Sequence, residues 1–336
     1  MKKFLPVAAI GAASLVLAAC GSSDGDGGGS STVLRVAFNQ TEDHPQYIAM
    51  TNMGERLEEA TDGRYSIEVY PNETLGAQQE AIQLLQDGSI ELALVGGAQL
   101  ENFSEDFVVW NLPMMFDSEE HQRSVINDPE IVGDLYAELE DQNISVLAGM
   151  FGGVRNVYNR DHPVVTPEDM QGMKIRVQES DTHIEMINLM GGAATPMAQG
   201  EVYTALQSGV LDGAENNELV FHDLKNDEVA PYYSYTRHLM VPDYLIANPS
   251  VLEEMSDEDR EAFETELAAA VDEEYDLFDE KVEEAIQAAE EGGAQFNDDV
   301  DAEAFAAILQ PFAEESVPDS DIAQQIYEDT RAAGEN

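Results

Sequence analysis

The sequence predicts an α/β protein, because short strand-like runs alternate with stretches of helix length and a long helix follows them. In the first region, strand-like runs at 33–38, 65–70 and 90–95 alternate with helical stretches at about 46–60 and 76–86. Residues 65–70 alternate apolar and polar side chains with a period of two, as in a half-buried strand. This βαβαβ order predicts a mostly parallel sheet with helices on both faces.

A second region with the same alternation occupies the middle of the chain. Strand-like runs occur at 146–148, 154–158 and 174–177, and helical stretches occur at about 181–190 and 201–208. Glycines follow both helical stretches, at Gly191 and Gly209, and glycine is common where a helix ends. The chain therefore predicts two α/β lobes.

The last third of the chain predicts one long helix. Residues 256–259 have the spacing of a capping box, and helix-favouring sequence continues to about residue 291. Apolar residues recur at roughly helical spacing between residues 263 and 286. At about 1.5 Å per residue, this helix would span about 50 Å, which exceeds one medium domain. We expect it to pack across both lobes; a break near Tyr275 is the alternative.

The N-terminus predicts a lipid anchor. Residues 1–20 combine two lysines, an apolar stretch interrupted by Pro6 and Gly11, and small residues that lead to Cys20. This segment is too short and too broken for a membrane-spanning helix. It resembles a signal peptide with the lipobox of bacterial lipoproteins, in which the cysteine is lipidated. An ordinary secretory signal with a chance cysteine is the alternative.

Cys20 is the only cysteine in the sequence, which excludes an intrachain disulfide and a thiol site elsewhere. Residues 21–32 contain only Gly, Ser, Thr and Asp, so they predict a flexible tether between the anchor and the folded body. We expect an extracytoplasmic protein that is anchored to the membrane, at the cell surface or in the periplasm, and does not span it.

The charge of the chain limits its partners. Lys and Arg number 15 against 68 Asp and Glu, which gives a formal net charge of -53. Nucleic acid is excluded as a partner, because phosphate binding needs a basic face. The acidity itself indicates solubility or a salt-rich environment. A site for an anion must depend on a few deliberately placed arginines.

Catalytic signatures are absent from the sequence. It has no G-x-S-x-G, no P-loop, no G-x-G-x-x-G after a strand and no H-E-x-x-H. Each of the six histidines stands alone, without a partner at metal-ligand spacing. The acidic run 297–301 lacks the spacing of a calcium loop and predicts a turn and a helix cap before residues 302–309. We therefore expect no enzymatic activity, no cofactor and no metal.

Several motifs in the middle of the chain stand in a recognisable order. They are Gly152-Gly153-Val154-Arg155-Asn156, Lys174-Ile175-Arg176-Val177, Ala194-Thr195-Pro196-Met197 and Gly209-Val210-Leu211-Asp212-Gly213-Ala214-Glu215-Asn216-Asn217, with Leu112-Pro113-Met114-Met115-Phe116 before them. This set resembles the substrate-binding proteins of TRAP transporters, the DctP family. The resemblance extends over nearly the whole body of the chain.

The resemblance implies a two-lobed architecture like that of periplasmic binding proteins, with an interlobe cleft, hinge strands and a long helix that spans both lobes. It places residues 33–152 and about 241–281 in lobe 1, and residues 153–240 and about 282–336 in lobe 2. It also implies that the protein captures a small organic acid without chemical change and delivers it to the membrane subunits of a TRAP transporter. A ligand receptor for a sensor kinase is the alternative.

The resemblance also implies which residues bind the ligand. Arg176, in the K-I-R motif, would form a bidentate pair with the substrate carboxylate, a geometry that lysine cannot provide. Arg155 would be a second ligand arginine, with a hinge-strand salt bridge as the alternative. Asn216 matches the ligand-contacting asparagine that follows D-G-A-E, and Asn217 is its neighbour; either can instead serve the local turn.

Details of the motifs favour the members of the family that bind sugar acids such as glucuronate or galacturonate. A polyhydroxylated acid needs neutral donors and acceptors beside the arginines, and His44, Asn217 and His238 are of suitable type. Two departures are Gln78-Gln79, where relatives often carry an acidic residue, and the apolar Met150-Phe151 before Arg155. A C4-dicarboxylate, a keto acid and an aromatic acid remain alternative ligands.

Overall fold

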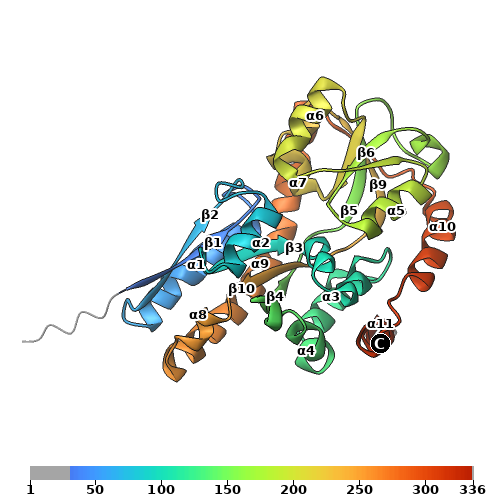
Figure 1. Cartoon of the computed structure of the whole chain (residues 1–336). Helices are drawn as coiled ribbons and strands as arrows, with labels where there is room; N and C mark the ends of the chain where they lie inside the picture. The colour runs from blue at the N-terminus through green and yellow to red at the C-terminus, as the bar shows by residue number, and fades with distance from the viewer. Residues whose placement is uncertain (1–30, 335–336) are drawn as a thin grey trace, which may run out of the picture. The chain divides into compact units, whose positions relative to one another are not determined.

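The computed structural model describes residues 31–334, whose strands form two sheets. The predicted signal segment, Cys20 and most of the predicted tether lie outside the described residues. Thr32, which composition places in the tether, begins the first strand. Each sheet and its helices form one lobe of an α/β fold (Figure 1). No helix between residues 31 and 334 is both long enough and apolar enough to cross a membrane.

The first sheet, which we call sheet A, has the strand order β2-β1-β3-β10-β4. Its strands are β1 (Thr32–Ala37), β2 (Tyr65–Tyr70), β3 (Leu92–Gly96), β4 (Ser145–Met150) and β10 (Asp243–Ala247). Its helices are α1 (Pro45–Ala60), α2 (Gln78–Gln86), α3 (Glu119–Ile126), α4 (Pro129–Ala137) and α8 (Ser250–Glu253). β1 pairs in parallel with β2 and β3, as the βαβαβ order predicts, whereas β10 runs antiparallel between β3 and β4.

Side chains of sheet A alternate between two hydrophobic cores. In β3, Leu92 and Leu94 belong to the core that includes α1, whereas Ala93 and Val95 belong to the core that includes α2, α3 and α4. All four are buried. Because helices cover both faces, the strand needs apolar residues at every position, which explains its continuous apolar sequence.

The second sheet, sheet B, has the strand order β11-β9-β5-β8-β6-β7. Its strands are β5 (Arg155–Asn159), β6 (Lys174–Val177), β7 (Ala193–Pro196), β8 (Gly213–Asn216), β9 (Tyr232–Leu239) and β11 (Gln295–Asn297). Its helices are α5 (Asp181–Leu189), α6 (Val202–Ser208), α7 (Glu218–Asp223) and α10 (Ala302–Glu315). Asp301 caps α10, since its Oδ1 accepts a hydrogen bond from Ala304 N at 3.1 Å. The acidic run before α10 is therefore a turn and cap, as predicted.

Within residues 31–334, four segments connect the lobes, the last of them residues 316–320 between α10 and α11 (Asp321–Gly334). The chain crosses from β4 to β5 through residues 151–154, returns from β9 to β10 through residues 240–242, and crosses again along the helix α9 (Asp257–Gly292). Gly153 in the first crossing has φ of 76°, and a Cβ there would lie 2.6 Å from Asn217 Nδ2. A side chain at this position would be strained and obstructed. The first two crossings are the hinge strands of the fold.

α9 is one continuous helix of 36 residues, so the break considered near Tyr275 does not occur (Figure 1). Ser256 Oγ caps it by accepting a hydrogen bond from Asp259 N at 3.1 Å, and the helix ends at Gly293 with φ of 105°. It packs on α1 and β4 of the sheet A lobe and on α7 of the sheet B lobe. The long helix therefore braces both lobes.

Two features differ from what the sequence pattern predicts. β9 and β10 are strands in a segment to which the sequence pattern assigned no element. The helix α11 (Asp321–Gly334) packs on α3, α4 and the 3-10 turn η2 (Glu105–Asn111), beside sheet A, although the sequence-based division places residues 282–336 in lobe 2. A short amphipathic helix carries no local signal that specifies which lobe it covers.

Glu274, in the middle of α9, is buried beside the first crossing. Its Oε2 accepts a hydrogen bond from Phe151 N at 3.2 Å, while Oε1 has no hydrogen-bond partner in the described part of the chain. Burial raises the pKa of Glu274 well above its usual value, and the negative charges of Asp243 and Glu119 add to the effect. The fold therefore favours the protonated form of this carboxyl group more than the unfolded chain does.

We predict that Glu274→Gln stabilises the protein by about 1–3 kcal/mol at neutral pH. The unfolded chain ionises this group above its usual pKa of 4.5, so the raised pKa in the fold costs free energy at higher pH. The difference should disappear as the pH falls below that value. Melting temperatures of both proteins across this pH range test the prediction, with the exposed Glu283→Gln on the same helix as control. Equal pH profiles for parent and Glu274→Gln would contradict it.

Candidate functional site

A narrow cavity of ≈ 20 Å³ lies between the two lobes. Its lining comprises Asn39, Gln40, His44, Gln78, Gly96 and Asp243 from the sheet A lobe, Arg155, Gln178, Gln199, Asn216, Asn217 and Val220 from the sheet B lobe, and Gly152 from the first crossing. Apart from Val220 and the two glycines, every lining side chain is polar. Such a lining suits a small hydrophilic ligand that is held by hydrogen bonds.

Arg176 lies on β6 between Ile175 and Val177, which point into the core shared with α5 and α10. Because side chains alternate along a strand, Arg176 points to the opposite face. Its Nε donates to Met197 O at 2.9 Å and its Nη1 donates to Gln199 Oε1 at 3.2 Å. Arg176 does not itself border the cavity, but Gln199 does.

The guanidinium of Arg176 is buried, at 2% exposure, and both of its acceptors are uncharged. Burial lowers the pKa of Arg176, although the negative charge of Glu215 acts in the opposite direction. An arginine nevertheless keeps its proton inside proteins. Among residues 31–334, no carboxylate lies within ion-pair distance of this guanidinium. It is a buried positive charge without a direct counter-ion, an expensive arrangement unless an anion joins it.

Arg155, on β5, is paired with a carboxylate of the protein. Its Nε and Nη2 donate to the two carboxylate oxygens of Glu215 at 2.6 and 2.8 Å, Nη2 also donates to Glu215 O, and Nη1 donates to Asn216 Oδ1. Burial alone would raise the pKa of Glu215, but Arg155 and His238 outweigh burial and lower it far below its usual value. Four of the five guanidinium hydrogens are used within the protein. Arg155 therefore has the salt-bridge role that the sequence leaves as the alternative, with one hydrogen remaining.

The two asparagines after β8 differ in what they can offer a ligand. Asn216 Oδ1 accepts from Arg155 Nη1 and from Asn217 N, while its Nδ2 has no partner among the described residues. Asn217 caps α7 by accepting from Val220 N at 2.9 Å, and its Nδ2 donates to Gly152 O at 2.8 Å. Both border the cavity. Asn216 retains a donor, whereas the side chain of Asn217 serves the helix and the crossing.

His44 borders the cavity and caps α1, since its Nδ1 accepts from Gln46 N at 3.3 Å. Burial lowers the pKa of His44 to about 3, so the ring is neutral at physiological pH. With Nδ1 acting as acceptor, we assign the proton to Nε2. In the described structure Nε2 has no hydrogen-bond partner, which leaves one neutral donor.

His238 does not border the cavity. Its Nδ1 lies 2.9 Å from Thr236 Oγ1, and its Nε2 lies 3.5 Å from Glu215 Oε2. The imidazole packs against the far side of the Arg155–Glu215 pair and supports it. The side chain faces Glu215, and its role as a ligand contact stays a prediction.

Several cavity residues are not among the site residues that the sequence predicts, namely Asn39, Gln40, Gln178, Gln199 and Asp243. A signal exists for Gln178, because it lies two residues after Arg176 and strand alternation places both on one side. Gln199 and Asp243 carry no such signal, since they enter from the turn after β7 and from the start of β10. Gln78, which stands out in the sequence as a departure from relatives, borders the cavity with an uncharged amide.

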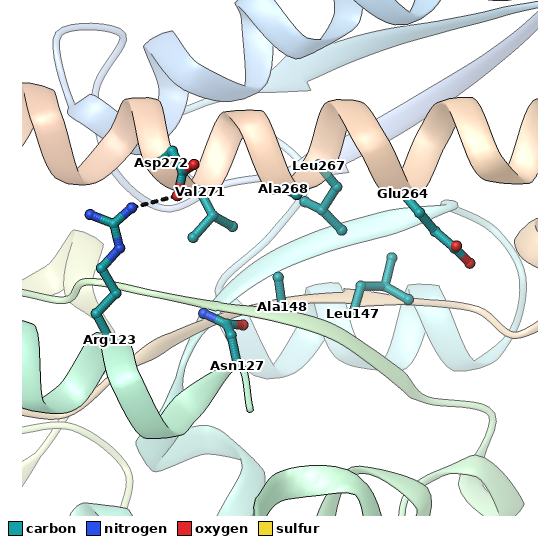
Figure 2. Close-up of a pocket in the computed structure, with 9 residues that line it drawn as sticks. All are labelled: Arg123, Asn127, Leu147, Ala148, Glu264, Leu267, Ala268, Val271 and Asp272. Carbon is teal, nitrogen blue, oxygen red and sulfur yellow. Dashed lines mark hydrogen bonds and ion pairs between the residues drawn. The ribbon is translucent and has the colours of Figure 1, made fainter. Parts of the chain in front are cut away.

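A larger hollow, of ≈ 340 Å³, lies on the sheet A lobe along α9. Figure 2 shows its lining, in which Leu147, Leu267 and Val271 are apolar. Its one cation, Arg123, is already paired with Asp272 (Figure 2). The hollow offers a ligand neither an unpaired charge nor a set of converging polar groups. The interlobe cavity is therefore the candidate site despite its smaller size.

Comparison with known proteins agrees with this geometry. Residues 36–319 match the family model described as bacterial extracellular solute-binding protein, family 7. A solute-binding protein of Chromohalobacter salexigens is 35% identical over 291 residues, which cover 86% of each chain. Residues 36–319 contain α9 and, apart from the start of β1, the strands of both sheets.

Solved structures resemble the chain over most of its length. A TRAP periplasmic solute-binding protein from Anaerococcus prevotii, with bound α/β-D-glucuronate, has a TM-score of 0.87 and 37% identity, covering 91% of this chain and 99% of its own. One from Xanthobacter autotrophicus, with bound β-D-galacturonate, has a TM-score of 0.83 and 30% identity, covering 89% and 99%. The two-lobed fold of the chain is that of these proteins.

We predict that Glu215→Gln destabilises the protein by about 3–5 kcal/mol, because the variant leaves the Arg155 guanidinium buried without a counter-ion. The matched control is Glu284→Gln, which breaks the exposed Lys281–Glu284 pair and should cost at most about 1 kcal/mol. Urea denaturation at neutral pH measures both. Because the pKa of Glu215 is lowered in the fold, its contribution should also fade as the pH drops below its usual value of 4.5. Equal losses in the two variants would contradict the prediction.

Proposed function

The chain belongs to family 7 of the bacterial extracellular solute-binding proteins, and on that premise we propose that it captures a uronate such as D-glucuronate or D-galacturonate for a TRAP transporter. The membrane subunits of the transporter are its protein partners. One observation carries the proposal: the guanidinium of Arg176 is buried beside a polar cavity and has only uncharged acceptors.

A carboxylate is the ligand group that this guanidinium suits best. Its planar fork of donors matches the two oxygens of a carboxylate, and charge-assisted bonds contribute about 1.5–3 kcal/mol each. Two such bonds supply a large part of the about 8 kcal/mol that a micromolar site requires. The side chain of Gln199 borders the cavity and accepts a hydrogen bond from Nη1 of Arg176. A bound carboxylate would have to displace this side chain or share Nη1 with it.

The charges around the cavity favour a monocarboxylate over a C4-dicarboxylate. Arg155 is neutralised by Glu215, so the site has one buried cation without a direct counter-ion. A second ligand carboxylate would meet at most one remaining hydrogen of Arg155 and would lie near Glu215. The cost of burying that second negative charge would be poorly compensated.

The remaining lining suits the hydroxyl groups of a sugar acid. His44 Nε2 and Asn216 Nδ2 are unused donors, and the side chains of Gln40, Gln78 and Gln178 add uncharged amides. Amides can donate and accept, as hydroxyl groups require. Structural neighbours that hold D-glucuronate and β-D-galacturonate support the same class of ligand.

Binding without chemical change is part of the proposal. The acid–base groups that border the cavity are His44 and Asp243. Burial lowers the pKa of His44 to about 3, which makes it a poor base, and Asp243 accepts a hydrogen bond from Gln46 Nε2 at 2.9 Å. Neither group is paired with a nucleophile. Ligand capture would instead shift the population toward the closed arrangement of the lobes.

We predict that the purified protein binds D-glucuronate or D-galacturonate with a micromolar or lower Kd, and that Arg176→Lys weakens binding at least about a hundredfold. Lysine keeps the charge but loses the bidentate geometry. Isothermal titration calorimetry measures both values, with D-glucose as the matched ligand that lacks the carboxylate and succinate as the dicarboxylate.

The control variant is Arg160→Lys, because Arg160 also donates to a main-chain carbonyl and is not among the residues that border the cavity. It should bind as the parent does, and both variants should melt within a few degrees of the parent. Tighter binding of succinate than of either uronate would overturn the choice of ligand. Unchanged affinity in Arg176→Lys would overturn the role of Arg176.

The lipid anchor is also a proposal, supported by the run Leu17-Ala18-Ala19-Cys20 after an apolar stretch. We predict that the protein fractionates with membranes and incorporates labelled palmitate when expressed in bacteria. Cys20→Ser should abolish labelling, because no other cysteine is present to accept the lipid. Ser22→Ala, two residues into the tether, is the control. Labelling that persists in Cys20→Ser would refute the anchor.

A further inference from the structure

Glu73 makes an exposed hydrogen bond from the sheet A lobe to the turn that holds Arg176. Its Oε2 accepts from Gly200 N at 3.1 Å, and Gly200 follows Gln199 directly in the turn η5 (Gln199–Glu201). The acidic side chain belongs to the loop after β2, on the sheet A lobe, whereas the turn belongs to the sheet B lobe. Glu73 is not a residue that the motif analysis selects.

The backbone presents Glu73 at a local conformational cost. Asn72 and Glu73 have φ of 56° and 54°, the left-handed region that residues other than glycine rarely adopt. Two main-chain bonds hold them there, from Asn72 N to Gln40 O at 2.9 Å and from Glu73 N to Phe38 O at 3.1 Å. Strained residues that the surrounding structure fixes in place are common at ligand clamps and switches. Here the left-handed backbone directs the carboxylate of Glu73 toward the sheet B lobe.

The contact with Glu73 leaves no room for a side chain at position 200. A Cβ at position 200 would lie 2.5 Å from Glu73 Oε2, and apart from Glu73 it would meet no atom within 4 Å. The other oxygen of Glu73, Oε1, is buried without a hydrogen-bond partner in residues 31–334. Burial raises the pKa of Glu73, while the Gly200 bond and the charge of Arg176 act in the opposite direction.

We propose that Glu73 is a positioning residue that latches the lobes together and fixes the turn 197–200, and through that turn Arg176, in the arrangement that holds the ligand. The proposal rests on the proposed function, because it assigns Glu73 to the same site. Few residues separate Glu73 from Arg176. The guanidinium donates to Met197 O and Gln199 Oε1, and the next residue, Gly200, donates its N–H to Glu73. Opening the lobes would break the Glu73 bond and release the turn.

The test compares three variants: Glu73→Ala, Gly200→Ala and the double variant. Glu73→Ala removes the bond, and Gly200→Ala forces the carboxylate away from Gly200 N. Each single variant should release radiolabelled D-glucuronate at least about tenfold faster than the parent, with association little changed. The double variant should be no worse than Glu73→Ala alone, because the added methyl group then has no carboxylate to displace.

Glu201→Gln is the matched control, since it removes an exposed negative charge from the same turn and leaves the Glu73–Gly200 bond in place. It should keep the dissociation rate of the parent. Hydrogen exchange at the Gly200 amide in the ligand-bound protein provides a second readout. Exchange should accelerate in Glu73→Ala and stay slow in Glu201→Gln.

The outcomes separate the latch from the proposed function. If the parent binds D-glucuronate but Glu73→Ala dissociates at the parental rate or binds more tightly, the latch is wrong and the proposed function stands. Additive losses in the double variant would also overturn the latch. If the parent binds none of the sugar acids, the proposed function fails and the latch fails with it.

Discussion

The site depends on isolating one buried guanidinium from the acidity of the rest of the chain. With 68 acidic residues and 15 basic ones, an exposed arginine would readily find a carboxylate of the protein itself. Arg176 avoids this because β6 turns it away from the surface and because a main-chain carbonyl and an amide hold it.

The two arginines of the site have different tasks. Arg155 and Glu215 form a buried ion pair whose remaining bonds go to Asn216 and, through His238, to β9. The pair ties β5 to β8 where the first crossing enters sheet B. Arg176 is left as the charge that selects an anion. A site with two unpaired guanidiniums would be harder to bury and would favour dianions.

The hinge and the site share residues. Gln46 Nε2 donates both to Phe151 O in the first crossing and to Asp243 Oδ2 at the start of β10. Asn217 Nδ2 donates to Gly152 O, and Glu274 of α9 accepts from Phe151 N. A change in lobe arrangement therefore alters the polar groups that border the cavity. This coupling gives a physical basis for closure that responds to the ligand.

The sequence by itself determined the parts that depend on local pattern: the βαβαβ order, the capped helix 257–292, the family motifs and the importance of Arg176 and Arg155 as candidate residues. Alternation, capping and motif spacing are properties of neighbouring residues, so they can be read along the chain. Only the tertiary structure decided that Arg155 is paired with Glu215, that His238 faces Glu215, that α11 covers sheet A and that Glu73 meets Gly200. Each of these depends on segments far apart in the chain that meet through packing, and no local pattern records which partners meet.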